Sequence, residues 1–344
     1  MCGLPFGRAP YLPAMVLVAI SSSILQCHDR FAIGAAMPVI FNLCLVIALI
    51  AAALDWLAIP TKTMAIAVLV AGILQALVMI IAVFRAKIAF SWFCFTPSRE
   101  MNDVFRRAFP GIVGAGVTQI NLVIGDILAS FLMAGAISWL YFADRLVQLP
   151  LALIGIALSL SLLPILSKAI AAGALTSAHT TMNEVLRVAS LLAFGAAVGL
   201  FTLSEPLITV LFGRGTFDAQ DIAETAYTLQ AFTIGLPALI ATKCLVQGFF
   251  ARLDTKTPII IAMICIFINL TSALVLSQYF AHIGIALGAS IAGWMNCLLI
   301  AWIAHKRNYL QLTHQTYACF LKLPWALGAM IIIIFFMKKV FFYI

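Results

Sequence analysis

The sequence predicts an all-α polytopic membrane protein with about ten transmembrane helices. Hydrophobic residues make up 64% of the 344 positions, charged residues make up 9%, and the mean hydropathy is +1.14. A soluble globular domain carries roughly a quarter charged residues, so this chain has too little charge to solvate a soluble fold of its size. Apolar stretches long enough to cross a bilayer recur along the whole chain.

About 20 apolar residues cross the hydrocarbon core as a helix, and a window of that length finds the spans in order. They lie at about residues 11–26, 34–54, 64–84, 109–132, 137–163, 185–203, 226–250, 258–280, 284–304 and 323–342. Pro150 and Pro164 should kink or end the fifth span, because proline lacks the N–H that a helix interior needs. Gly284 and Gly288 form a GxxxG pattern, which predicts close approach of another helix to the ninth span.

The net charge of +8 is distributed as the positive-inside rule expects, which argues against a nucleic-acid partner. Of the 20 Lys and Arg residues, 13 fall on one side of the predicted spans and 5 on the other. The first side, which includes the segments 87–107 and 168–184, is therefore predicted to be cytoplasmic, and the segment 205–224 to lie outside. The chain divides into a three-span region with a basic loop (1–108), a six-helix lobe (109–304) and a loop with one further span (305–344).

Signatures of catalysis or metal binding are missing from the sequence. The eight cysteines show no CxxC spacing and read as packing residues, so neither a disulfide framework nor a zinc site is predicted. The histidines, His282 among them, fall near span ends or in loops and are interpreted as solvated interface residues. No G-x-S-x-G, H-E-x-x-H or phosphate-binding glycine loop is present, and the chain is predicted not to be an enzyme.

A polar stripe in the fifth span is the first candidate site. Ser138, Tyr141, Arg145 and Gln148 follow at three- and four-residue spacing and share one helix face. An arginine near the bilayer centre costs at least about 2.5–3.5 kcal/mol, so Arg145 must face a polar cavity or a partner. One interpretation is that Arg145 binds a substrate. The other is that it has a structural role only and is packed against its neighbour Asp144, as an ion pair, or against a carbonyl group across the bundle.

Lys243 in the seventh span adds a second deep cation, with Gln247 one turn on. Its side chain either contacts a substrate or extends toward the cytoplasmic surface, as long lysine side chains do. Two buried cations with little neutralising carboxylate would form an electropositive cavity, whose natural occupant is an anion. The candidate substrate-binding residues are Arg145, Asp144, Lys243, Ser138 and Gln148.

Asp126 in the fourth span shares a face with Gln119 and Ser130. It could pair with Arg145, hold a proton, or coordinate a hard cation together with Asn269 and Ser290, since such ions prefer oxygen ligands. The residues leave these alternatives open. No cofactor is predicted, and coupling to a monovalent cation or a proton is the open hypothesis.

Several stretches carry a family resemblance. Residues 114–126 (GAGVTQINLVIGD) lead to 138–150 (SWLYFADRLVQLP), and 211–217 (LFGRGTF) and 248–258 (GFFARLDTKTP) follow. These segments resemble the MurJ (MviN) family of lipid II flippases, and the resemblance covers nearly all residues from about 10 to 310.

The resemblance implies a bundle of the multidrug/oligosaccharidyl-lipid/polysaccharide exporter superfamily, with two lobes around a central cationic cavity. Arg145 matches the family's functional arginine, Lys243 falls where the family carries a lysine, and Asp126 is similar to an acid linked to cation binding. The ten spans correspond to helices four to thirteen, so the chain resembles an N-terminally truncated member whose first helices could be encoded separately.

The implied function is transport of lipid II, the undecaprenyl-linked peptidoglycan precursor, across the bacterial inner membrane for cell-wall synthesis. Lipid II or a related polyprenyl diphosphate-sugar and the membrane lipids are the implied partners. One alternative is an exporter of drugs or other polyprenyl-linked sugars from the same superfamily. Another is an inactive fragment or scaffold.

Overall fold

The computed structural model describes residues 11–28, 30–54, 60–86, 119, 123 and 125–342, and all of its regular elements in these ranges are helices. The chain divides into two compact units, Met1–Ser98 and Arg99–Ile344. Within the described residues, seven helices are long and apolar enough to cross a membrane. The predicted all-α membrane fold is therefore confirmed, whereas the fourth predicted span and the boundary at residue 108 fall largely or wholly outside the described residues.

The first unit contains α1 (Tyr11–Cys27), α2 (Phe31–Ala53) and α3 (Pro60–Arg85), close to the first three predicted spans. Helix α3 packs against both α1 and α2. The fully buried side chains of Leu25 and Met79 lie in the shared core, and the buried Gln75 amide donates to the Met37 carbonyl over 2.7 Å. This hydrogen bond satisfies the amide nitrogen of Gln75 inside an apolar bundle, where leaving it unpaired would be costly.

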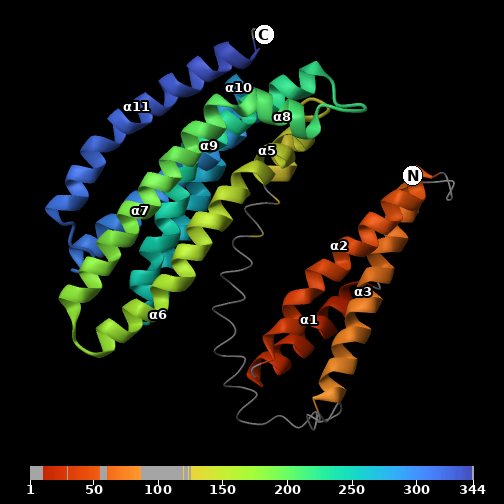
Figure 1. Cartoon of the computed structure of the whole chain (residues 1–344), viewed down its shortest axis with the longest axis horizontal. Coiled ribbons are helices and arrows are strands. Elements are labelled where there is room, and N and C mark those ends of the chain that lie inside the picture. Colours follow the sequence, from red (N-terminus) through yellow and green to blue (C-terminus); the bar gives the residue numbers. More distant parts are fainter. Residues whose placement is uncertain are drawn as a thin grey trace. The chain divides into compact units, whose positions relative to one another are not determined.

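The second unit is built around α9 (Ala219–Phe250), which packs against α5 (Ala136–Pro150), α6 (Ala157–Ala171), α7 (Leu175–Thr202), α8 (Ser204–Phe212) and α10 (Lys256–Lys306). Leu229, Leu236, Ile240 and Phe249 of α9 have no exposed surface. Helix α11 (His314–Phe342) instead lies along α7 at the side of the bundle (Figure 1). Its span has only 6% of its residues buried, so most of its apolar surface is left for lipid.

Pro150 ends α5, as predicted, and a π-helical turn, Leu151–Ile156, links it to α6. The proline has no N–H to bond the carbonyl four residues back, so the backbone widens at this point. Helix α6 then continues through Pro164 to Ala171, beyond the predicted span end.

Helix α10 is a hairpin of two helices that reverses at Ala281, where φ is 47° and ψ is −129°. In a straight helix, Ala273 and Gly288 would lie about 22 Å apart at 1.5 Å per residue. A Cβ atom added to Gly288 would nevertheless lie 2.8 Å from the backbone nitrogen of Ala273. The close approach predicted from the GxxxG pattern is confirmed, and the two halves correspond to the eighth and ninth predicted spans.

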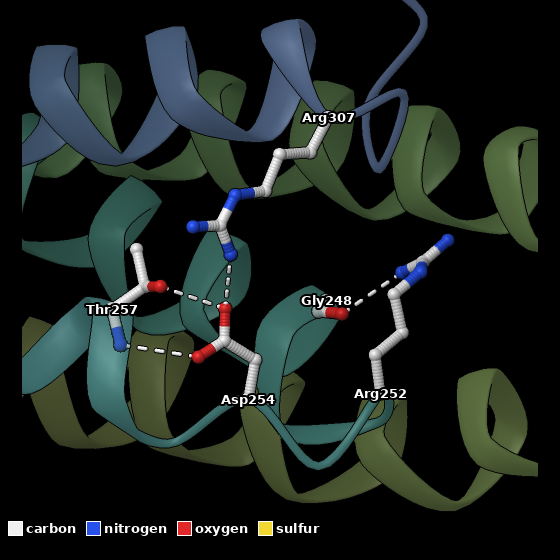
Figure 2. Close-up of polar contacts among 5 residues, drawn as sticks. All are labelled: Gly248, Arg252, Asp254, Thr257 and Arg307. Carbon is white, nitrogen blue, oxygen red and sulfur yellow. Dashed lines mark hydrogen bonds and ion pairs between the residues drawn. The ribbon is translucent and has the colours of Figure 1, made fainter.

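The turn that follows α9 is joined to the end of α10 (Figure 2). Asp254 accepts hydrogen bonds from the Thr257 N–H (3.1 Å) and hydroxyl (2.7 Å), and its Oδ2 forms an ion pair with Arg307 at 2.5 Å. Arg252 points elsewhere: it donates to the Gly248 carbonyl over 2.8 Å, and its guanidinium lies 4.3 Å from the centre of the Tyr309 ring. The Asp254 carboxylate thus accepts hydrogen bonds from the first turn of α10 and pairs with Arg307, which directly follows the last residue of this helix.

Several predicted loops are shorter than expected. The segment 168–184 was expected to be a loop, but α6 runs to Ala171 and α7 begins at Leu175. Helix α8 likewise occupies part of the segment 205–224. Hydropathy detects only the part of a helix inside the hydrocarbon core, whereas the backbone hydrogen bonds continue into the interface, where polar side chains are tolerated.

Candidate functional site

The polar stripe of the fifth predicted span lies on α5. Its buried face, Ala136, Trp139, Ala143, Leu146 and Val147, follows helical spacing and turns inward, and α5 packs against α9. Ser138, Tyr141, Arg145 and Gln148 are exposed on the rest of the helix surface. Burial of one face therefore fixes the orientation of the other.

Arg145 is held by two neighbours on its own helix. Its Nη2 donates to the Tyr141 hydroxyl over 2.9 Å, and its Nη1 donates to Gln148 Oε1 over 3.4 Å. The guanidinium carbon also lies 4.6 Å from the centre of the Tyr141 ring. The two partners lie one helical turn before and after Arg145, and their contacts hold the guanidinium in one orientation. This lowers the conformational entropy that the side chain loses when it binds a ligand.

Asp144 does not neutralise Arg145 by direct contact. Gln148 lies between them, because its amide nitrogen donates to Asp144 Oδ2 while its oxygen accepts from Arg145. In the part of the chain that the structure describes, the ion pairs within 4.0 Å are His282–Glu224 and Arg307–Asp254. A polar relay of Tyr141, Arg145, Gln148 and Asp144 thus leaves the arginine charge available to an anion.

Lys243 lies on α9, the helix against which α5 packs, and its side chain is exposed. Gln247 donates to the backbone carbonyl of Lys243 over 3.2 Å, so this amide bonds the helix itself. Among the described residues, no hydrogen bond or ion pair joins Lys243 to Arg145. The structure therefore places the two cations on neighbouring helices without bringing them into contact.

The three ion-binding candidates lie in different environments. Asp126 is exposed in the helical residues 125–130, and Asn269 is half-buried in the first half of α10. Ser290 is buried and donates to the Ala231 carbonyl over 2.6 Å, which joins α10 to α9. Gly235 makes that contact possible, since a Cβ there would lie 2.7 Å from the Ser290 Oγ. Over the described residues, no group of three or more His, Cys, Asp or Glu could hold a metal ion.

Sequence reasoning missed a polar cluster at the reversal of α10. His282 was interpreted as a solvated interface residue, but it is only 2% exposed. Its Nε2 lies 3.4 Å from Glu224 Oε2, and its ring lies 4.8 Å from that of Trp139. Trp139 in turn donates to Asp221 over 2.7 Å, so the cluster joins α5, α9 and α10. Its position directly after Ala281 places the imidazole inside the bundle, which hydropathy alone could not indicate.

Comparison with known proteins gives one consistent result. The sequence matches the family described as "Lipid II flippase MurJ" over residues 8–344. It is 36% identical over 303 residues to a probable lipid II flippase MurJ of Rickettsia prowazekii (strain Madrid E), covering 88% of this chain and 59% of the relative. It is 37% identical over 306 residues to the protein of the same description from Rhizobium tropici, covering 88% and 57%. The chain therefore spans somewhat less than three fifths of the length of these relatives.

Solved structures give the same fold. A structure described as "Lipid II flippase MurJ, inward closed conformation" superposes with a TM-score of 0.83 at 25% identity, over 97% of this chain and 68% of that one. An inward-facing multidrug resistance MATE family transporter of the MOP superfamily superposes with a TM-score of 0.76 at 14% identity, over 88% and 71%. The second likeness concerns the fold alone.

Proposed function

This chain belongs to the lipid II flippase MurJ family, and from that premise we propose that it carries lipid II across the bacterial inner membrane by alternating access. It is a transporter, and it performs no covalent chemistry on its substrate. The observation that carries the proposal is the exposed, pre-oriented guanidinium of Arg145 on α5.

The diphosphate of lipid II is the group that Arg145 would recognise. A planar guanidinium binds phosphate oxygens through two parallel charge-assisted hydrogen bonds, which are stronger than neutral ones. Tyr141 and Gln148 hold the guanidinium in place, and the relay through Gln148 keeps Asp144 from competing directly with the anion. Ser138 extends the same exposed stripe, and Lys243 supplies a second positive charge on the adjacent helix.

The test is binding of purified lipid II to the full chain in nanodiscs of neutral lipid. We expect Arg145→Ala to weaken binding at least tenfold, since a hydrogen bond to a charged group contributes about 1.5–3 kcal/mol. Arg145→Lys should keep part of the affinity, because lysine retains the charge and loses the planar fork. Arg214→Ala is the matched control: Arg214 is exposed, and its Nη2 donates to the nearby Leu211 carbonyl over 2.9 Å.

Growth of a flippase-depleted strain that expresses each variant gives the second readout, with protein level measured by immunoblot. A folded, well-expressed Arg145→Ala protein that binds lipid II as the unchanged chain does would disprove the assignment of Arg145. A drug bound in place of lipid II, with the same dependence on Arg145, would favour a multidrug exporter. Absence of lipid II binding in every variant, the unchanged chain included, would indicate an inactive fragment or scaffold.

A further inference from the structure

A groove of about 420 Å³ lies between α7 and α11, at the side of the second unit. Arg187, Gln315 and Lys322 line it together with Cys319, Leu191 and Leu323. The groove is separate from the Arg145 stripe, because α11 packs along α7 whereas α5 packs against α9 and the segments around it. It therefore calls for an explanation of its own.

The groove is electropositive. Arg187 and Lys322 are the charged residues of its lining, and no carboxylate lines it. Arg187 Nη1 donates to Gln315 over 3.0 Å, but its Nε is buried without a hydrogen-bond partner in the described part of the chain. Glu184, one turn earlier on α7, forms no ion pair with Arg187 within 4.0 Å among these residues. Charge-assisted hydrogen bonds are stronger than neutral ones, so the guanidinium of Arg187 and the ammonium group of Lys322 favour a ligand with acceptor oxygens here.

Asn183 holds the groove in shape. This residue is 1% exposed, and its amide nitrogen donates to the Gln311 carbonyl over 2.7 Å. Its oxygen accepts from the Thr313 N–H at 3.1 Å and from the Thr316 hydroxyl at 2.8 Å. These bonds fix the first turn of α11 against α7 at a point one helical turn before Arg187. The helices that carry Arg187 and Lys322 are therefore held side by side before any ligand binds.

Both cations lie where the apolar part of their helix begins. Arg187 follows the start of the apolar stretch 185–203, and Lys322 directly precedes the stretch 323–342. Tyr317 and Trp325, which are 53% and 83% exposed, stand on α11 on either side of Lys322. Exposed tyrosine and tryptophan mark the level of the lipid headgroups, and the charge distribution assigns this level to the cytoplasmic leaflet.

We propose that this groove binds an anionic phospholipid of the cytoplasmic leaflet, with its phosphate between Arg187 and Lys322. Leu191, which is 52% exposed, lines the groove and offers apolar surface for an acyl chain, and large apolar side chains farther along α11, such as Ile332 and Ile333, are exposed. A free phosphate ion would use the two cations and leave that surface uncovered. The two cations and the adjoining apolar surface therefore fit a lipid anion that bridges α7 and α11.

The test uses the purified full chain in detergent micelles that contain either phosphatidylglycerol or phosphatidylcholine, with bound lipid counted by native mass spectrometry. We expect phosphatidylglycerol to be retained and phosphatidylcholine to be lost. Arg187→Gln with Lys322→Gln should weaken retention about fivefold for each charge removed, because each basic residue near the surface contributes attraction of that order. Lys322→Gln alone should weaken retention about fivefold, which is half of the effect of the double variant on a logarithmic scale. Because Lys322 is exposed, this variant should keep the fold.

The matched control is Lys168→Gln with Lys256→Gln, which removes two exposed charges from the same predicted side and leaves the groove intact. Equal retention by both double variants, or equal retention of the two lipids, would overturn the proposal. Displacement by inorganic phosphate at similar concentration would indicate an ion site in place of a lipid site. Displacement by undecaprenyl diphosphate at far lower concentration would make the groove part of the substrate path, which also contradicts the assignment.

Discussion

At the scale of single residues, the contacts of Arg145 show how a membrane-embedded charge can be held without being neutralised. Its neighbour Asp144 forms no ion pair with it within 4.0 Å in the described part of the chain, and Gln148 and Tyr141, one turn away on either side, make the contacts. Adjacent residues on a helix diverge by about 100°, whereas residues three and four apart face each other. The arginine is therefore oriented by neutral partners and keeps its charge for a ligand.

Asp126 provides a test of ion coupling at this scale. We expect Asp126→Asn to keep more activity than Asp126→Leu, because an exposed polar side chain needs its oxygen and its shape more than its charge. Support of growth by each variant, measured with and without added sodium and at two external pH values, checks this. An Asn variant as inactive as the Leu variant would show that the carboxylate carries an ion or a proton.

The sequence predicted which residues form the stripe on α5 but not how they pair. Helical spacing is sufficient to place Ser138, Tyr141, Arg145 and Gln148 on one face, and the exposed positions agree. The relay through Gln148 depends on side-chain rotamers, which periodicity does not determine. His282 was misjudged for a related reason, because its burial depends on the backbone reversal at Ala281.

At the scale of elements, the α10 hairpin depends on the absence of a side chain at Gly288. A Cβ there would lie 2.8 Å from a backbone atom of Ala273, which cannot move aside as a flexible side chain can. We expect Gly288→Ala to destabilise the chain by about 1–3 kcal/mol, and Gly288→Val by more, through overpacking. The apparent melting temperature of the purified protein measures the effect.

Gly195 in α7 is the matched control for this substitution, because a Cβ there would meet nothing within 4 Å. Gly195→Ala should be neutral or stabilising by up to about 1 kcal/mol, since alanine favours helix more than glycine does. Equal destabilisation by the two alanine variants would show that helix propensity, and not the approach of Ala273, determines the role of Gly288.

The Asp254 junction between the two ends of α10 gives a pH-dependent prediction. Burial raises the pKa of Asp254, but the hydrogen bonds from Thr257 and the charge of Arg307 outweigh it and hold the pKa below its ordinary value of 3.8. A depressed pKa in the folded state contributes stability that is present above the unfolded pKa and is lost as pH falls through the folded pKa.

We therefore expect Asp254→Asn to lower the melting temperature at neutral pH, with a loss of roughly 1–2 kcal/mol from the missing charged acceptor. The difference from the unchanged chain should stay constant down to about pH 5 and shrink as pH falls below 3.8. Melting curves of both proteins over this range provide the measurement. A difference that grows on acidification would contradict the assigned role of the carboxylate.

Helix ends were the weakest part of the sequence-based prediction at this scale. The apolar cores of the first three spans were located well, as α1, α2 and α3 show. The start of α11 at His314 was missed, because Gln315 and Thr316 lower the local hydropathy. Asn183 fixes that turn through contacts far apart in sequence, and such tertiary hydrogen bonds leave no periodic signal.

At the scale of the whole molecule, the charge asymmetry predicts an orientation that can be measured directly. In a variant without the eight native cysteines, single cysteines would replace the exposed Ala172, between α6 and α7, and the exposed Thr216, between α8 and α9. We expect an impermeant thiol reagent to label position 216 in intact cells and position 172 only after the membrane is opened. The reverse pattern would invert the predicted topology.

The reversal at Ala281 also bears on how this chain enters a membrane during synthesis. The two halves of α10 already contact each other through Gly284 and Gly288, and few residues separate them. A pair of apolar helices joined so tightly can leave the insertion machinery together, with each half satisfying its backbone hydrogen bonds internally. We therefore expect residues 256–306 to insert as one unit, so that a charge introduced into one half hinders the integration of both.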